Sequence, residues 1–406
     1  MNFEEAAFLT KSYGQSHLLR YYGELNAAER EELLASIAET DFSVLRSLGA
    51  SEAKNAGRLS PADVLSAGEI AVNAQSYEKT GLEAIRKNKV AAVLLAGGQG
   101  TRLGLDAPKG TFNIGVKRKL SIFECQILNL LSVAKRAGVY PHLFIMTSNI
   151  NDVQTQAFFK ENANFGYPAD KVHFYRQKTA PAISKDGKIL LEEKYRVALV
   201  PNGNGGWYSS LVSSACGHIL KDEGIEWLNV YGVDNVLQKI CDPVFIGATI
   251  KSGLACSGKV VKKAYPEERV GLLCKSDGLP AIVEYYEMPE KENYEREENG
   301  ELKYRFGVIL NYLFNVKKLD GIGAEKLPYH FAEKKVEYIG EGKKIVPEAP
   351  NAYKPETLTV DLVKFMGSCL GFEVEREREF APVKNRTGVD SVESARALLI
   401  KNGVEI

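Results

Sequence analysis

Short apolar runs alternate with segments of helical pattern between residues 89 and 235, and this alternation constrains the fold more than any other feature. A short continuous apolar run is typical of a strand that is buried on both faces. One intervening segment, SIFECQILNLLSVAKRAG, begins with Ser121 and Glu124 at capping-box spacing and ends at Gly138, so it predicts a helix. Strands that alternate with helices predict an α/β protein with a doubly wound, mostly parallel, Rossmann-like sheet. The predicted strands are VAAVLLA (90–96), HLFIMTS (142–148), VHFYRQ (172–177) and WLNVYGVDN (227–235).

The segments on either side of this region have different patterns. Residues 1–85 contain no β-rich run, and Leu33, Leu34 and Ile37 recur at helical spacing, so we expect a helical N-terminal segment. Further on, VGLLCK and PAIVEYYE flank Ser276-Asp277-Gly278, which predicts an antiparallel hairpin. We therefore expect a helical segment at 1–85, a core domain at 86–320 and a small C-terminal domain at 321–406. The charged stretch 291–303 is expected to be an exposed excursion.

Composition excludes several classes of partner. The 406 residues include 52 Lys and Arg against 52 Asp and Glu, so the chain lacks the basic excess that binds nucleic acid or anionic membranes. Its six cysteines form no CxxC pair, which argues against a zinc site or a disulfide framework. No apolar run approaches the roughly 20 residues that a membrane helix needs. We expect a cytoplasmic protein with no nucleic-acid or membrane partner; its oligomeric state is not indicated.

The glycine-rich stretch Leu94–Thr111, LLAGGQGTRLGLDAPKGT, follows the first predicted strand. Ligands of such sheets bind at the carboxyl ends of the strands, so this loop is well placed. It is not the dinucleotide fingerprint, because Leu103 stands where the third glycine is required, and this argues against an oxidoreductase. The GxxxxGK[ST] pattern of a P-loop is also absent.

The composition of this loop favours a polyphosphate ligand. Gly97, Gly98 and Gly100 can bring backbone N–H groups close to a ligand, while Arg102 and Lys109 add formal positive charge. Arginine suits bidentate phosphate contacts, and lysine acts as a mobile point charge. The alternative is a flexible connector that carries two solvated cations.

Asp234 ends the apolar run WLNVYGVDN. A carboxylate at the carboxyl end of a strand, close to bound phosphates, suits Mg²⁺, which takes one or two carboxylates together with phosphate oxygens. We therefore expect a requirement for Mg²⁺, with Mn²⁺ as a substitute. The alternative is a cap on the following helix.

The motif LLAGGQGTRLGxxxPKG resembles the signature loop of the UDP-sugar pyrophosphorylases, closest to the eukaryotic-type UDP-N-acetylglucosamine pyrophosphorylases. The similarity continues in order over about 300 residues, through FYRQKTAPAIS, PNGNGGWYSSL, NVYGVDNVLQKICDPVFIG, VGLLCKSDG, IVEYYE and FAPVKN. It implies a nucleotidyltransferase core and UTP and a sugar 1-phosphate as substrates. The sugar-phosphate oxygen would attack the α-phosphorus and pyrophosphate would leave, aided by Mg²⁺ and without a covalent enzyme intermediate.

The same resemblance implies roles for individual residues. Alone, Gln177 would be interpreted as a polar strand end, Lys384 as a surface lysine, and Glu284 as a residue on a solvated strand face. By similarity the roles are catalysis for Arg102, Lys109 and Lys384; nucleotide binding for Gly97, Gly98, Gln177, Gly203 and Asn204; sugar binding for Gly271, Glu284 and Val308; and metal binding for Asp234.

The chain departs from the N-acetylglucosamine pattern around the sugar. Val308 follows Gly307 where that family has an asparagine, and Leu358 and Val360 stand in place of two phenylalanines. Asn202 replaces a usual aspartate. A missing partner for a polar group changes discrimination, so we expect a relaxed or reversed preference for N-acetylglucosamine 1-phosphate over glucose or galactose 1-phosphate. The alternatives are a UDP-glucose or UDP-galactose type of pyrophosphorylase and a non-catalytic nucleotide-sugar binding protein.

Overall fold

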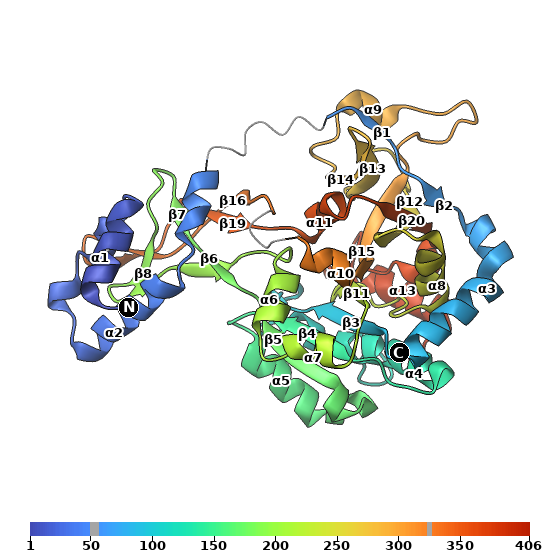
Figure 1. The fold of residues 1–406 in the computed structure, drawn as a ribbon, viewed down its shortest axis with the longest axis horizontal. Helices are drawn as coiled ribbons and strands as arrows, with labels where there is room; N and C mark the ends of the chain where they lie inside the picture. The colour runs from blue at the N-terminus through green and yellow to red at the C-terminus, as the bar shows by residue number, and fades with distance from the viewer. Residues whose placement is uncertain (49–56, 323–326) are drawn as a thin grey trace. The chain divides into compact units, whose positions relative to one another are not determined.

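The computed structural model describes residues 1–48, 57–322 and 327–406 of the chain. The chain forms two compact units, each assembled from three stretches of sequence (Figure 1). In the described residues, no helix is long and apolar enough to cross a membrane. The small unit comprises Met1–Asn55, Gln177–Gly206 and Lys326–Thr359, and the large unit comprises Ala56–Arg176, Trp207–Glu325 and Val360–Ile406.

An 11-stranded sheet forms the centre of the large unit. Its main path runs in the order β2-β20-β12-β15-β11-β3-β4-β5. Neighbours on this path are parallel, except that β15 is antiparallel to both β11 and β12. The strands are β1 (Leu59–Pro61), β2 (Val64–Leu65), β3 (Val90–Leu95), β4 (Leu143–Thr147), β5 (Val172–Arg176), β11 (Trp227–Gly232), β12 (Cys256–Lys262), β13 (Leu272–Ser276), β14 (Leu279–Val283), β15 (Phe306–Asn315) and β20 (Cys369–Glu373).

All four predicted strands form, as β3, β4, β5 and β11. Every residue of β3 and β4 is buried, which agrees with their continuous apolar character. The carboxyl ends of β3 and β11 lie side by side, because Leu95 pairs with Gly232. The loops that carry Lys109 and Asp234 therefore leave the same edge of the sheet.

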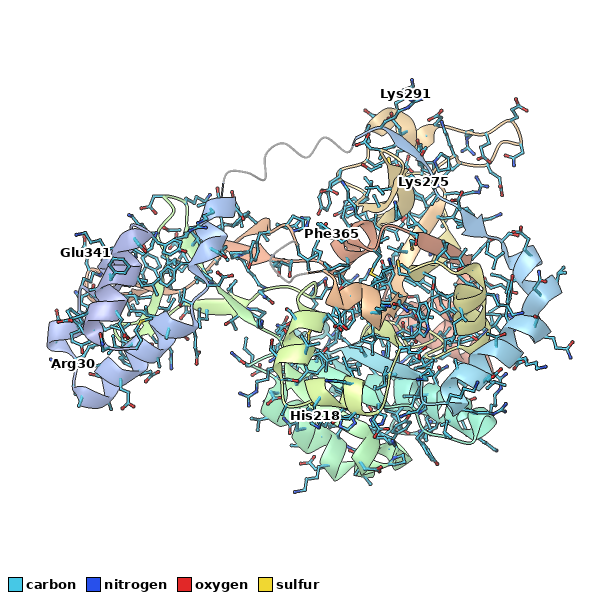
Figure 2. All side chains as sticks on the ribbon, in the orientation of Figure 1. Arg30, His218, Lys275, Lys291, Glu341 and Phe365 are labelled. Carbon is cyan, nitrogen blue, oxygen red and sulfur yellow. The ribbon has the colours of Figure 1, made fainter. Side chains whose placement is uncertain are left out.

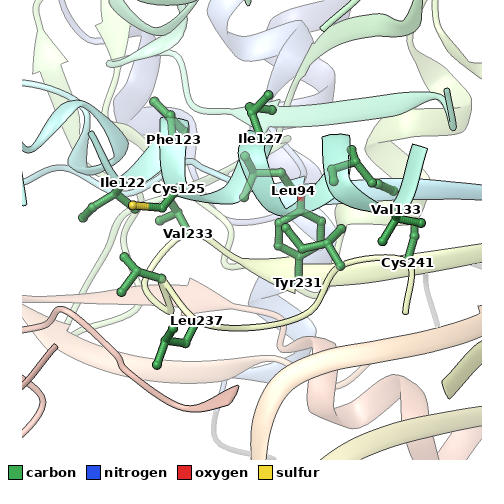
Figure 3. Packing of buried hydrophobic residues seen from close by; sticks show 14 of the residues in the cluster. Leu94, Ile122, Phe123, Cys125, Ile127, Val133, Tyr231, Val233, Leu237 and Cys241 are labelled. Atoms are coloured by element: carbon green, nitrogen blue, oxygen red, sulfur yellow. The ribbon is translucent and has the colours of Figure 1, made fainter. Parts of the chain in front are cut away.

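Helices cover both faces of this sheet, as a doubly wound fold requires. Residues of α3 (Ala67–Arg86), α4 (Ile122–Ala137) and α8 (Pro243–Ser252) share one apolar cluster with the strands. Figure 3 shows Ile127 and Val133 of α4 with Leu94 and Tyr231 in this cluster. On α6 (Trp207–Ser213), the ring of Trp207 lies 5.8 Å from that of Phe314 on β15. The remaining helices of this unit are α5 (Asp152–Glu161), α7 (Gly217–Asp222), α9 (Glu290–Tyr294), α10 (Val316–Asp320), α12 (Arg376–Glu379) and α13 (Val392–Lys401), with α11 (Thr359–Phe365) at the unit boundary.

The ends of α4 match the sequence signals. The Oγ of Ser121 accepts a hydrogen bond from the Glu124 N–H at 3.0 Å, and Gly138 ends the helix with φ +77°. The Glu124 carboxylate binds Arg118 at 2.9 Å, so only the first half of the predicted capping box forms.

The predicted hairpin is also present. β13 and β14 pair antiparallel, and the turn residues Asp277 and Gly278 have φ of +51° and +83°, as a type I′ turn requires. The residues of the charged stretch 291–303 are exposed or half-buried, except for buried Leu302, and Lys291 marks the stretch in Figure 2.

The small unit combines N-terminal helices with short antiparallel strand pairs. Its helices are α1 (Phe3–Ser12) and α2 (Ala27–Glu39), and Leu33 and Ile37 of α2 are fully buried with Ile183 and Ile189. Its strands are β6 (Thr179–Pro181), β7 (Ile183–Ser184), β8 (Leu191–Glu193), β9 (Arg196–Val197), β10 (Leu199–Pro201), β16 (His330–Lys334), β17 (Tyr338–Gly340), β18 (Lys343–Ile345) and β19 (Ala352–Glu356).

These units differ from the expected division at 1–85, 86–320 and 321–406. The N-terminal segment is split, because β1 pairs with β13 and β2 pairs with β20 of the large unit. Residues 177–206 leave the expected core, since β7 pairs with β19 in the small unit. The C-terminal stretch from Val360 joins the large unit, where β20 extends the main sheet.

Candidate active site

The glycine loop after β3 folds back on itself. Gly100 donates to the Ala107 carbonyl at 2.9 Å, and the Lys109 N–H donates to the Gly98 carbonyl at 3.2 Å. At Gly98 a Cβ would meet nothing within 4 Å, so the backbone there faces open space. The fold of the loop thus places Lys109 beside Gly98, although eleven positions separate them in sequence.

Asn151 fixes the base of this loop from the end of β4. Its Nδ2 donates to the carbonyls of Ala96 at 2.9 Å and Gly98 at 3.3 Å. Asn151 is buried, and sequence reasoning did not identify it. The polar run TSNIND after the apolar strand HLFIM could have indicated it, because polar residues at the carboxyl end of a parallel strand are well placed for a site.

Lys109 and Asp234 form an ion pair at this edge of the sheet. The Nζ of Lys109 lies 2.5 Å from Oδ1 of Asp234, and the side chains are 11% and 39% exposed. Burial lowers the pKa of Lys109, and the charges of Arg102 and Lys384 lower it further, whereas Asp234 raises it. The three cations and the carboxylate predicted from separate motifs therefore lie close enough to interact.

The segment that carries Lys384 is attached to both loops. The Val383 N–H donates to the Asp234 carbonyl at 2.9 Å, and Arg386 Nε donates to the Leu103 carbonyl at 2.7 Å. The ammonium group of Lys384 itself is 3.0 Å from the carboxylate of Asp390. Lys384 is thus held between the glycine loop and the loop after β11.

The three predicted sugar residues also lie together. The Val308 N–H donates to the Gly271 carbonyl at 2.9 Å, and a Cβ on Gly271 would lie 3.3 Å from Oε1 of Glu284. The last pair between β11 and β15 joins Tyr231 to Asn311. Asp234 follows Tyr231 by three residues, and Val308 precedes Asn311 by three residues on the antiparallel strand β15. Both therefore lie beyond the same end of this strand pair, and the Val308 cluster is at the same edge of the sheet as Asp234.

The other predicted nucleotide residues, Gln177, Gly203 and Asn204, belong to the small unit. Gly203 has φ +83°, and a Cβ there would lie 2.3 Å from the Thr357 carbonyl oxygen, so only glycine fits. Asn204 Oδ1 accepts from the Thr359 N–H at 2.9 Å. Their assignment to the nucleotide remains a prediction from the sequence.

Comparison with known proteins gives the family. Residues 50–403 match the UTP–glucose-1-phosphate uridylyltransferase family. The UDP-N-acetylhexosamine pyrophosphorylase-like protein 1 of Mus musculus is 37% identical over 93% of this chain and 79% of its own length. The UDP-N-acetylglucosamine pyrophosphorylase of Saccharomyces cerevisiae is 35% identical over 96% of this chain and 88% of its own length.

A solved structure of the Trypanosoma brucei uridine diphosphate N-acetylglucosamine pyrophosphorylase superposes with a TM-score of 0.85 at 29% identity, covering 99% of this chain and 85% of that one. The chain therefore belongs to the UTP–glucose-1-phosphate uridylyltransferase family of UDP-sugar pyrophosphorylases, and it is a nucleotidyltransferase. The resemblance noted in the glycine loop and the following motifs is confirmed.

Proposed function

We propose that the chain forms a UDP-sugar and pyrophosphate from UTP and a sugar 1-phosphate at the edge of the sheet where β3 and β11 end. The observation that carries the proposal is the contact of Lys109 with Asp234, with the charges of Arg102 and Lys384 acting on the same lysine. Three cations, two of them paired with the carboxylates of Asp234 and Asp390, suit a group of phosphates better than a neutral ligand.

The reaction needs alignment and charge neutralisation. An oxygen of the sugar 1-phosphate forms a bond to the α-phosphorus of UTP, the bond from that phosphorus to the α,β-bridging oxygen breaks, and pyrophosphate carries away the electron pair. No protein nucleophile is required. Arg102 and Lys109 would stabilise the charge that builds on the leaving pyrophosphate, and Lys384 would act on the incoming and α-phosphates.

Asp234 is the residue that would hold Mg²⁺. No group of three or more His, Cys, Asp or Glu side chains that could hold a metal is found among the described residues. A single half-buried carboxylate fits Mg²⁺, because this ion keeps water ligands and takes others from substrate phosphates. When bound, the ion would neutralise phosphate charge.

N-acetylglucosamine 1-phosphate is the leading sugar substrate, because the relatives at 33–37% identity carry N-acetylhexosamine or N-acetylglucosamine pyrophosphorylase names. Glucose or galactose 1-phosphate is the second candidate. It is favoured by Val308, whose backbone joins the Gly271–Glu284 cluster but whose apolar side chain offers no hydrogen bond to an acetamido group.

The test is pyrophosphate release from UTP across these three sugar phosphates, with Mg²⁺ at saturation. We expect activity with N-acetylglucosamine 1-phosphate. The preference for this sugar over the plain hexose phosphates should be at most about 200-fold in kcat/KM, that is, about 3 kcal/mol. A preference above about a thousandfold would show that another residue replaces the missing asparagine. Absence of pyrophosphate release with all three sugars would overturn the proposed function.

A further inference from the structure

Asn235, the residue after Asp234, joins the Asp234 loop to the segment that carries Lys384. Its Nδ2 donates to the Glu379 carbonyl at 2.6 Å, and its Oδ1 accepts from the Ala381 N–H at 2.9 Å. Asn235 is 4% exposed. One buried amide thus bonds the residues on both sides of Phe380 in the sequence. Lys384 follows Ala381 by three residues.

Backbone hydrogen bonds continue this junction on both sides of Asn235. The Val236 N–H donates to the Ala381 carbonyl at 3.3 Å, and the Val383 N–H donates to the Asp234 carbonyl at 2.9 Å. The two segments therefore run together as a short bridge that begins beside Asp234 and ends at the residue before Lys384. A shift at Ala381 would be transmitted directly to Lys384.

Buried glutamine side chains hold the loop that carries Asp234 at the residues just before it. Gln126 of α4 donates to the carbonyls of Gly232 at 3.2 Å and Val233 at 3.1 Å, and Gln238 donates to Gly232 at 2.7 Å. Both glutamines are buried. Because three buried hydrogen bonds converge on the adjacent carbonyls of Gly232 and Val233, Asn235 is attached to a well-supported loop.

We propose that Asn235 is a positioning residue that sets the place of Lys384 relative to Asp234 and Lys109. This inference rests on the proposed function, in which Lys384 acts on the α-phosphate. Asn235 contacts the Lys384 segment through hydrogen bonds to its backbone groups, which add to the packing of Ala381 and Val383 in the apolar core. Its own amide need not reach substrate, because both of its polar atoms have partners in the protein.

A kinetic double-mutant cycle between Asn235→Ala and Lys384→Ala tests the inference. We expect Lys384→Ala to lower kcat about 100-fold or more, and Asn235→Ala to lower it about tenfold with KM for UTP changed less than about threefold. In the double variant, kcat should stay within about twofold of Lys384→Ala alone, because a misplaced Lys384 no longer matters once it is removed.

Thr249→Val is the matched control for lost buried polar contacts. The Thr249 hydroxyl lies 2.6 Å from that of Ser257, and neither residue is in the two joined segments. This variant should lower thermal stability but leave kcat within about twofold of native, so that the tenfold loss from Asn235→Ala is not a general result of a lost buried hydrogen bond. If Asn235→Ala does not fold, Asn235→Asp, which keeps the acceptor for Ala381 and loses the donor to Glu379, enters the same cycle.

Two results would contradict these assignments in different ways. If the losses from Asn235→Ala and Lys384→Ala simply multiply, Asn235 does not act through Lys384 and the inference is overturned, while the proposed function stands. If Lys384→Ala keeps native turnover, the role given to Lys384 under the proposed function is wrong, and the inference is lost with it.

Discussion

Lys109→Met separates the charge of this lysine from its packing. The lysine side chain is only 11% exposed, so a methionine of similar length can retain most of the contacts of its stem. What disappears is the ammonium group 2.5 Å from Asp234. Measurements on this variant therefore show whether that positive charge contributes to folding stability or to catalysis.

The two possibilities predict different magnitudes. Asp234 is 39% exposed, so water can solvate its carboxylate when the lysine is gone, and the pair contributes no more than about 1 kcal/mol to stability. Loss of a group that stabilises developing charge on phosphate costs about 2.7–4 kcal/mol of transition-state stabilisation, that is, about 100–1,000-fold in kcat. Turnover should fall steeply while the melting temperature changes by only a few degrees.

Pyrophosphate release at saturating UTP, sugar 1-phosphate and Mg²⁺ gives kcat, and calorimetry gives the melting temperature. Arg102→Met should lose turnover over the same range. Lys117→Met, at an exposed lysine eight residues along the chain, should stay within about twofold of native. A Lys109→Met enzyme that melts like the native protein and retains more than a tenth of its turnover would refute the phosphate role of Lys109.

Three further predictions concern metal, stability and pH. Chelator should abolish activity, and Asp234→Asn should raise the Mg²⁺ concentration needed for half-maximal rate; full activity in chelator would contradict this role. Lys259 is fully buried between the carboxylates of Glu379 and Asp242, so Lys259→Met, which leaves both charges buried without a partner, should lower the unfolding free energy by about 3–5 kcal/mol. In the same denaturant titrations, Lys262→Met, at an exposed position of the same strand, should lower it by less than about 1 kcal/mol. Burial lowers the pKa of His142 and lowers that of His173 from 6.5 to about 4, so the folded state disfavours protonation. Unfolding free energy should be flat above pH 6.5 and fall by about 1–2 kcal/mol as pH drops from 6.5 toward 4; a constant value across that range would contradict the lowered pKa values of these two histidines.

The parts of the fold that could be predicted are those with local causes. Strands β3 and β4 are buried on both faces, so their sequences are continuously apolar, and α4 carries its own start and stop residues. The two units could not be predicted, because distant pairings define them. Tyr353 of β19 pairs with Ile183 of β7, and strands of two or three residues such as β1 and β2 carry no pattern of their own.

The candidate site divides in the same way. Arg102 and Lys109 could be predicted because they lie in a glycine-rich loop that follows an apolar strand, and Asp234 because it closely follows another strand of the same parallel sheet. Lys384 required the family resemblance, since a lysine in FAPVKN has no local signal. Asn235 was missed because its link to the Lys384 segment is recognised only from the groups that it bonds there, and Glu379 and Ala381 lie more than 140 positions away.

The electrostatics of the site explain why an anion should bind there. Each lysine is held by a carboxylate, Lys109 by Asp234 at 2.5 Å and Lys384 by Asp390 at 3.0 Å. Even so, burial, with smaller contributions from the charges of Arg102 and Lys384, keeps the pKa of Lys109 below its usual value. A triphosphate carries several negative charges and more acceptor oxygens than a carboxylate, and it would relieve the repulsion among Arg102, Lys109 and Lys384. The cations Arg102, Lys109 and Lys384 outnumber the carboxylates of Asp234 and Asp390, and this excess positive charge is available for substrate phosphates and for the departing pyrophosphate.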